Sequence, residues 1–127
     1  MFVGIDIVSI PRMKKIIGDI NLKKSKGVLS SIFSKNEIKK CSSLKNPYKY
    51  YAVRFAGKEA LLKALGTGLS RGILFSDMEF LNYEKGIPFV KCHGETKKEL
   101  MKKRIKKINV SFSHSRENAV AVVILEN

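Results

Sequence analysis

The stretch Arg54-Phe55-Ala56-Gly57-Lys58-Glu59-Ala60-Leu61-Leu62-Lys63-Ala64-Leu65-Gly66-Thr67-Gly68 decides the fold of this chain. At about 3.6 residues per turn, it predicts a helix that ends at Gly66, a residue typical of the left-handed position that stops a helix. One side of this helix carries only small side chains, namely Ala56, Gly57, Ala60 and Ala64. We therefore expect this side of the helix backbone to lie very close to whatever packs on it.

Another side of the same helix is charged and holds Arg54, Lys58, Glu59 and Lys63. One carboxylate among three cations suits a site for a metal and phosphates. A plain surface face is the other interpretation, because Glu59 and Lys63 stand four residues apart, as in common helical ion pairs. Such pairs contribute only about 0–1 kcal/mol when they are solvated. The helix alone leaves both interpretations open, and other segments must decide between them.

The size and charge of the chain limit the classes of protein it belongs to. We place a single domain over residues 1–127, since the length leaves no room for a second one. The formal net charge of +14 implies an acidic partner, such as a nucleic acid, an anionic membrane, a phosphorylated ligand or an acidic protein. No signal segment is visible, and no apolar run approaches the roughly 20 residues of a membrane span. We expect a cytoplasmic protein that contacts no membrane, with Cys41 and Cys92 reduced.

Apolar periodicity and turn residues outline the remaining elements. Strands are expected at 2–8, 75–81, 87–92, 108–112 and 119–125, and helices at 10–17, 35–40, 47–65 and 96–103. Ser34 and Glu37 have the spacing of a capping box, and the segment 21–27 is predicted to be a basic loop. Short connections at 82–86 and 114–118 predict two hairpins. The fold class is α+β, with one long helix and shorter helices packed on an antiparallel sheet.

Two residues outside the long helix carry possible chemistry. Asp6 lies in the expected first strand, where aspartate is disfavoured, so it is either exposed near a strand end or a ligand of a hard cation. Magnesium prefers a few carboxylates with water and phosphate oxygens, and Asp6 with Glu59 makes a suitable pair. His114 follows a strand and either caps local backbone or donates to a phosphate. His93 has no such context and is predicted to be a loop residue.

Three segments of the chain share their order and spacing with a known enzyme family. Gly4-Ile5-Asp6-Ile7-Val8 is similar to its N-terminal GxDIV motif, Arg54–Gly68 to its RFAxKEAxxKAxGTG core, and Ser113-His114-Ser115 to its terminal SHS. The chain thus resembles the holo-acyl-carrier-protein synthases, which are small 4′-phosphopantetheinyl transferases. The resemblance covers essentially the whole chain. Gly57 and Phe112 depart from the commoner residues at their positions but keep the chemistry.

The resemblance implies a reaction that belongs to fatty acid biosynthesis. Coenzyme A donates its 4′-phosphopantetheine to a serine of an apo acyl carrier protein, adenosine 3′,5′-bisphosphate leaves, and magnesium is required. The splitting of a diphosphate also calls for a metal and for cations around it. We expect Asp6 and Glu59 as metal ligands, and Glu59 and Lys63 as catalytic residues, with Lys63 neutralising charge on the leaving phosphate. The proton acceptor is either Glu59 or a metal-bound water.

Further expectations concern the ligands of the nucleotide and the partners. We expect Arg54, Lys58 and His114 to hold the phosphates of coenzyme A. The resemblance implies a homotrimer with active sites between subunits, because a single module holds half of a site. The basic residues Arg12, Lys14 and Lys15 of the first expected helix are predicted to dock the acidic carrier. A solvated basic face is the other interpretation of these three residues.

Two other functions fit the basic composition. A nucleic-acid-binding module is the first, because 25 Lys and Arg residues suit phosphate contacts. The chain shows no signature of an RRM, a KH domain or a helix-turn-helix, so we expect no nucleic-acid partner. A small basic interaction protein without catalysis is the second.

Overall fold

A computed structural model describes all 127 residues. They form five helices, one short 3₁₀ turn and five strands, joined by loops. In chain order these are β1 (Phe2–Ser9), α1 (Ile10–Ile17), α2 (Ser25–Ile32), α3 (Lys35–Ser42), α4 (Pro47–Leu65), η1 (Phe75–Asp77), β2 (Met78–Asn82), β3 (Pro88–Cys92), α5 (Gly94–Lys102), β4 (Lys107–His114) and β5 (Asn118–Glu126). The expected α+β class is confirmed. None of the helices is both long and apolar enough to cross a membrane.

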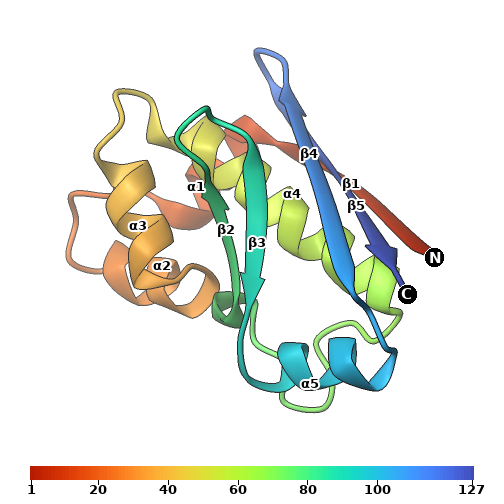
Figure 1. The fold of residues 1–127 in the computed structure, drawn as a ribbon. Coiled ribbons are helices and arrows are strands. Elements are labelled where there is room, and N and C mark those ends of the chain that lie inside the picture. Colours follow the sequence, from red (N-terminus) through yellow and green to blue (C-terminus); the bar gives the residue numbers. More distant parts are fainter.

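The strands form two antiparallel sheets around the long helix. One sheet has the order β1-β5-β4, and the other pairs β2 with β3, so both expected hairpins are present. Helix α4 runs through the centre of the molecule, with the three-stranded sheet on one side and the short helices α1–α3 gathered on the other (Figure 1). The core lies between these layers and includes Tyr51 and Leu61 of α4 and Phe80 of β2.

The small face of α4 is packed against β1 at Ala60 and Ala64, whereas Gly57 faces the ring of Phe80 in β2. A Cβ atom added at Gly4 would lie 1.8 Å from the backbone oxygen of Ala60 and 2.9 Å from the backbone nitrogen of Ala64. Glycine is therefore required at position 4 by the close approach of two backbones. The expectation of close packing on the small face is confirmed, and this contact fixes β1 relative to the charged part of α4.

Gly4→Ala is expected to destabilise the fold by about 3 kcal/mol or more, because the clash is with backbone atoms that cannot move aside. Urea unfolding of the purified variant measures this loss. Gly27→Ala is the matched control, since a Cβ added at this helical position meets nothing within 4 Å. Alanine is the better helix former, so this control should be as stable as the wild type or slightly more stable. Equal stability of Gly4→Ala and wild type would contradict the close contact.

Two segments differ from the expectation. The basic segment 21–27 runs into the helix α2, which lacks a side-chain N-cap and is held by its buried Leu29 and by the adjacent Phe33. Without a cap or acidic first turn, this helix depends on tertiary packing that the local sequence does not reveal. Residues 75–77 form the turn η1, so the second strand begins at Met78.

Candidate active site

Two carboxylates from distant parts of the chain meet beside the contact of β1 with α4. Asp6 comes from β1, two residues after the glycine that touches α4, and its side chain points to the same face of the strand. Glu59 comes from α4, and both carboxylates line one cleft of about 330 Å³ together with Ser9, Arg12 and Phe55. The structure thus brings together the pair that was expected to hold a metal.

Lys63 binds the strand rather than its neighbour on the helix. Its Nζ lies 3.0 Å from Oδ1 of Asp6 and donates a second hydrogen bond of 3.0 Å to the carbonyl oxygen of Ile5. The Lys63 side chain is 56% exposed, whereas that of Asp6 is 17% exposed. Lys63 therefore partly neutralises Asp6 while its side chain remains largely exposed to solvent.

The environment of Glu59 disfavours its charged form. Partial burial raises its pKa, the negative charge of Asp6 raises it further, and Lys63 opposes both effects. Two neighbouring carboxylates with incomplete neutralisation are suited to a divalent cation. No group of three or more His, Cys, Asp or Glu side chains is arranged for a metal in this chain. Magnesium commonly takes one or two carboxylates and completes its shell with water and phosphate oxygens, so the donor set fits it.

A second cleft of about 390 Å³ shares Glu59 with the first. Lys63 and Leu62 border it on the helix, and Gly66, Gly68, Leu69 and Phe75 border it on the following segment. Leu69 is 51% exposed, which is high for an apolar side chain of this size. The sequence did not identify Leu69 or Phe75 as site residues, because an isolated apolar residue in a loop carries no signal of its own.

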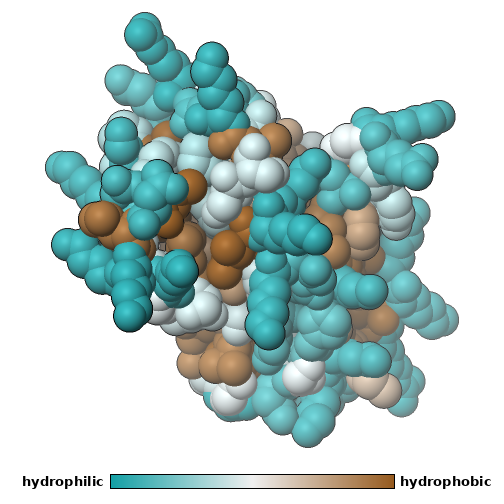
Figure 2. Space-filling view, turned by 90° about the vertical axis from the view of Figure 1, so that its left-hand side faces the viewer, coloured by the Kyte–Doolittle hydropathy of each residue, from teal (hydrophilic) through white to brown (hydrophobic).

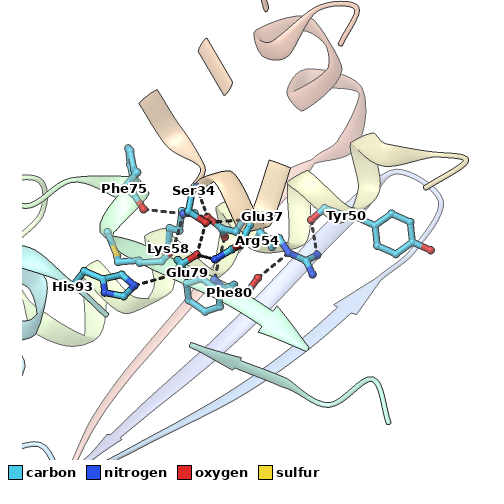
Figure 3. Close-up of polar contacts among 11 residues, drawn as sticks. Ser34, Glu37, Tyr50, Arg54, Lys58, Phe75, Glu79, Phe80 and His93 are labelled. Carbon is cyan, nitrogen blue, oxygen red and sulfur yellow. Dashed lines mark hydrogen bonds and ion pairs between the residues drawn. The ribbon is translucent and has the colours of Figure 1, made fainter. Parts of the chain in front are cut away.

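Arg54 and Lys58 lie away from these clefts, in the buried interface between α4 and β2 (Figure 3). The Lys58 ammonium group has no exposed side-chain surface and donates to Oε1 of Glu37 at 2.6 Å and to two backbone carbonyls, of Phe75 and Met78, at 2.7 Å each. The Arg54 guanidinium donates to the carbonyl oxygens of Phe80 and Tyr50 and to Oδ1 of Asn82. This placement argues against the phosphate contacts expected for Arg54 and Lys58, and it gives both cations a structural role.

Glu37 is the buried partner of Lys58. The expected capping box with Ser34 is present, and the second carboxylate oxygen of Glu37 accepts a hydrogen bond of 3.0 Å from the backbone N–H of Phe80. Burial raises the pKa of Glu37 and lowers that of Lys58, and each charge opposes the shift of the other. A buried pair of this kind is sensitive to the removal of either partner.

The prediction for His93 was incomplete. His93 is the N-cap residue of α5, and its Nε2 lies 2.7 Å from Oε1 of the buried carboxylate of Glu79 (Figure 3). Ser34 and Asn36 donate to the other oxygen of Glu79, at 2.7 and 3.1 Å. These contacts tie β2 to α3 and to the start of α5. They lie outside both clefts that contain Glu59.

His114 is exposed at the end of β4 and lies apart from the carboxylate pair. It borders one cleft with Ser113 and Ser115, and another with Asn46, Lys49 and Arg116. Neither cleft contains Asp6 or Glu59. Within one chain, the structure therefore does not bring His114 to the predicted metal site. Lys49 and Arg116, which were not singled out in the sequence, add two cations beside this histidine.

The three basic residues of α1 have different surroundings. Arg12 lines the cleft with Asp6 and Glu59, whereas Lys15 is exposed and has no partner. The Nζ atom of Lys14 lies 5.3 Å from the ring centre of Tyr48. Long hydrophilic side chains project over the side of the molecule on which the short helices gather (Figure 2). Arg12 is thus the member of this group with a direct connection to the site.

Comparisons with known proteins agree on one family. The family model of the 4′-phosphopantetheinyl transferase superfamily matches residues 2–123. A holo-[acyl-carrier-protein] synthase of Syntrophus aciditrophicus is 42% identical over 123 residues, which are 97% of this chain and 93% of that protein. The crystal structure of the Helicobacter pylori synthase in complex with coenzyme A has a TM-score of 0.82 and 30% identity, and the match covers 98% of this chain and 99% of that one. The Neisseria meningitidis synthase gives a TM-score of 0.85 at 28% identity, over 99% and 98% of the two chains.

Proposed function

The chain belongs to the holo-acyl-carrier-protein synthases, enzymes of the 4′-phosphopantetheinyl transferase superfamily, and we propose that it uses magnesium and releases adenosine 3′,5′-bisphosphate. Coenzyme A is the donor, and a serine of an acidic apo acyl carrier protein is the acceptor. We place the reaction in fatty acid biosynthesis in the cytoplasm. The observation that carries the proposal is the meeting of Asp6 and Glu59 in one cleft, with Lys63 bound to Asp6.

Each group of the cleft has a role that fits its surroundings. Asp6 and Glu59 supply the oxygen ligands of the magnesium ion, which would polarise the diphosphate of coenzyme A when bound. Glu59 has a raised pKa, as suits a group that accepts the proton of the serine hydroxyl. The exposed ammonium group of Lys63 stabilises the negative charge that develops on the leaving phosphate.

Intact mass spectrometry of the carrier tests the proposed reaction. Purified enzyme, coenzyme A, magnesium and an apo acyl carrier protein should convert the carrier to a species heavier by one phosphopantetheine group. A carrier whose acceptor serine is replaced by alanine should keep its mass. No mass change with the intact carrier, under conditions in which a known synthase modifies it, would overturn the proposal.

A neighbouring subunit would complete the site. The face of the three-stranded sheet turned away from α4 exposes Val3, Ile5 and Ile7 by 58%, 59% and 66%. Continuous apolar surface of this kind typically marks an interface. His114 lies in a cleft of its own with Lys49 and Arg116, a cationic surface suited to a phosphate. We propose a homotrimer in which these residues of one subunit hold the nucleotide phosphates bound at the carboxylates of the next.

Subunit mixing tests the shared site. Glu59→Gln and His114→Ala should each be nearly inactive alone, because each variant spoils every site of its own trimer. After the two are mixed and allowed to exchange subunits, some interfaces combine an intact Glu59 with an intact His114, and activity should return in part. Transfer assays before and after exchange measure this. A fully active monomer, established by sedimentation at the assay concentration, would contradict the shared site.

The carrier is expected to dock on α1. Arg12 is exposed and borders the cleft of Asp6 and Glu59, so an acidic carrier bound there would bring its serine close to the diphosphate. Arg12→Glu should raise KM for the carrier by about tenfold, and leave KM for coenzyme A nearly unchanged. The wild-type rate should fall with salt, since exposed charges are screened beyond about 10 Å at 0.1 M. Lys39→Glu, on α3, is the control; an equal effect there would place the docking surface elsewhere.

A further inference from the structure

The segment between α4 and η1 forms one wall of the second cleft. Gly66, Gly68 and Leu69 of this segment line the cleft next to Glu59 and Lys63. Its internal hydrogen bonds are three: the Thr67 hydroxyl donates to the carbonyl of Gly68 at 3.1 Å, the Ser70 hydroxyl donates to the carbonyl of Thr67 at 2.7 Å, and the N–H of Ile73 donates to the carbonyl of Ser70 at 3.1 Å. Ile73, at its far end, is the buried residue of the segment. The part that borders the cleft therefore depends on contacts to other elements for its position.

Arg71 makes the polar contact between this segment and α5. Its Nη1 lies 3.2 and 3.4 Å from the two carboxylate oxygens of Glu99, whose side chain is 9% exposed. Lys102 is a second cation on the same carboxylate, at 3.6 Å. The adjacent Gly72 packs on α5 as well, because a Cβ added there would lie 3.3 Å from Cγ of Glu95. The segment is thus attached to α5 directly after the residues that line the cleft.

The backbone of Arg71 shows that arginine is not the locally favoured residue here. Its φ is 59°, in the left-handed region that favours glycine. Glycine would adopt this turn without strain but would have no contact with Glu99. An arginine at this position therefore keeps the ion pair at a conformational cost, which points to a use for the contact beyond making the turn.

We propose that Arg71 is a positioning residue for the binding of coenzyme A. By anchoring the segment on Glu99, it holds Gly68 and Leu69 in place in the wall of the cleft that Glu59 and Lys63 also line. This inference rests on the proposed function, since it assigns the second cleft to the donor. Arg71 itself is directed toward α5 and does not touch the donor or the reacting atoms.

Arg104 offers a matched control. It is also an exposed arginine with φ of 59°, but it makes no ion pair. Arg71→Gly and Arg104→Gly each remove one cation and relieve the same backbone strain. Only the first variant detaches the cleft wall, so only it should raise KM for coenzyme A, by about threefold to fivefold, with kcat nearly unchanged. Arg71→Lys should restore part of the loss.

Hydrogen–deuterium exchange supplies a readout that does not depend on activity. Amides in the segment 66–73 should exchange faster in Arg71→Gly than in wild type, and at the wild-type rate in Arg104→Gly. Glu99→Gln should reproduce the effect of Arg71→Gly, and the double variant should add little. If the wild type is active but Arg71→Gly and Arg104→Gly have the same KM for coenzyme A and the same amide exchange rates, the proposed role of Arg71 is wrong. Loss of transfer in the wild type would instead refute the proposed function.

Discussion

Asp6→Asn and Glu59→Gln are each expected to lower the rate of transfer by at least about 100-fold while the protein remains folded. Both substitutions keep the shape of the side chain and remove the negative charge, which is needed both to bind a hard cation and to accept a proton. The two carboxylates come from β1 and α4 and share one cleft, so neither can replace the other from its own position. Initial rates of carrier modification, measured over a range of magnesium concentrations, give the loss.

Stability should move in the opposite direction to activity for Glu59→Gln. Burial and the charge of Asp6 already disfavour the ionised form of Glu59, so a neutral side chain removes an unfavourable interaction at neutral pH. We expect a melting temperature equal to or above that of the wild type. Glu84→Gln, an exposed carboxylate in the turn between β2 and β3, is the control and should change neither quantity. Full activity of either site variant would refute the pair as metal ligands.

The pH dependence of the transfer rate follows from the raised pKa of Glu59. A carboxylate with a raised pKa becomes protonated at a higher pH than an ordinary glutamate does, and the protonated form neither binds a cation well nor accepts a proton. Activity should therefore fall on the acid side at a pH above the ordinary range of glutamate, and kcat/KM profiles measure this.

The sequence predicted that the small face of α4 packs closely, but it did not identify β1 as the element that packs there. A small helix face at Ala60 and Ala64, and a glycine in the first strand, are visible in the sequence, and the structure places them in direct contact. Asp6 follows two residues later on the same face of the strand, so its meeting with Glu59 follows from this packing. The pairing of Asp6 with Glu59 could nevertheless be predicted from the sequence.

The roles of Arg54 and Lys58 were harder to predict, although part of the signal was present. At about 100° per residue, Lys58 and Glu59 point in different directions, so the charged residues form two stripes rather than one. The stripe with Glu59 and Lys63 borders the clefts, whereas Arg54 and Lys58 point into the core. Only the tertiary structure shows that β2 and α3 cover this second stripe. The proposed place of His114 depends on another subunit, which no single-chain pattern contains.

Lys58→Met should destabilise the fold by about 3–5 kcal/mol, because it leaves Glu37 buried without its partner. The carbonyl oxygens of Phe75 and Met78 also lose their donor. The stability deficit should be smaller near roughly pH 5 than near roughly pH 8. A buried carboxyl without its cation has a raised pKa in the folded state, so the folded variant binds a proton more tightly than the unfolded chain does. The stability of the Lys58→Met variant therefore decreases as the pH rises, and this decrease ends once the pH is above the pKa of Glu37 in the folded state.

Comparison with Lys63→Met distinguishes the structural role of Lys58 from the catalytic role proposed for Lys63. The Lys63 side chain is 56% exposed, and its pair with Asp6 should contribute at most about 1 kcal/mol to stability. Its removal should instead lower kcat by about 100-fold or more, if its charge acts on the leaving phosphate. Urea unfolding and transfer kinetics on both variants form the test, with Lys58→Met assayed at low temperature to keep it folded. If Lys58 has a structural role, Lys58→Met should lose stability and keep its KM for coenzyme A. A stable Lys58→Met variant with a strongly raised KM for coenzyme A would instead show that Lys58 binds a phosphate.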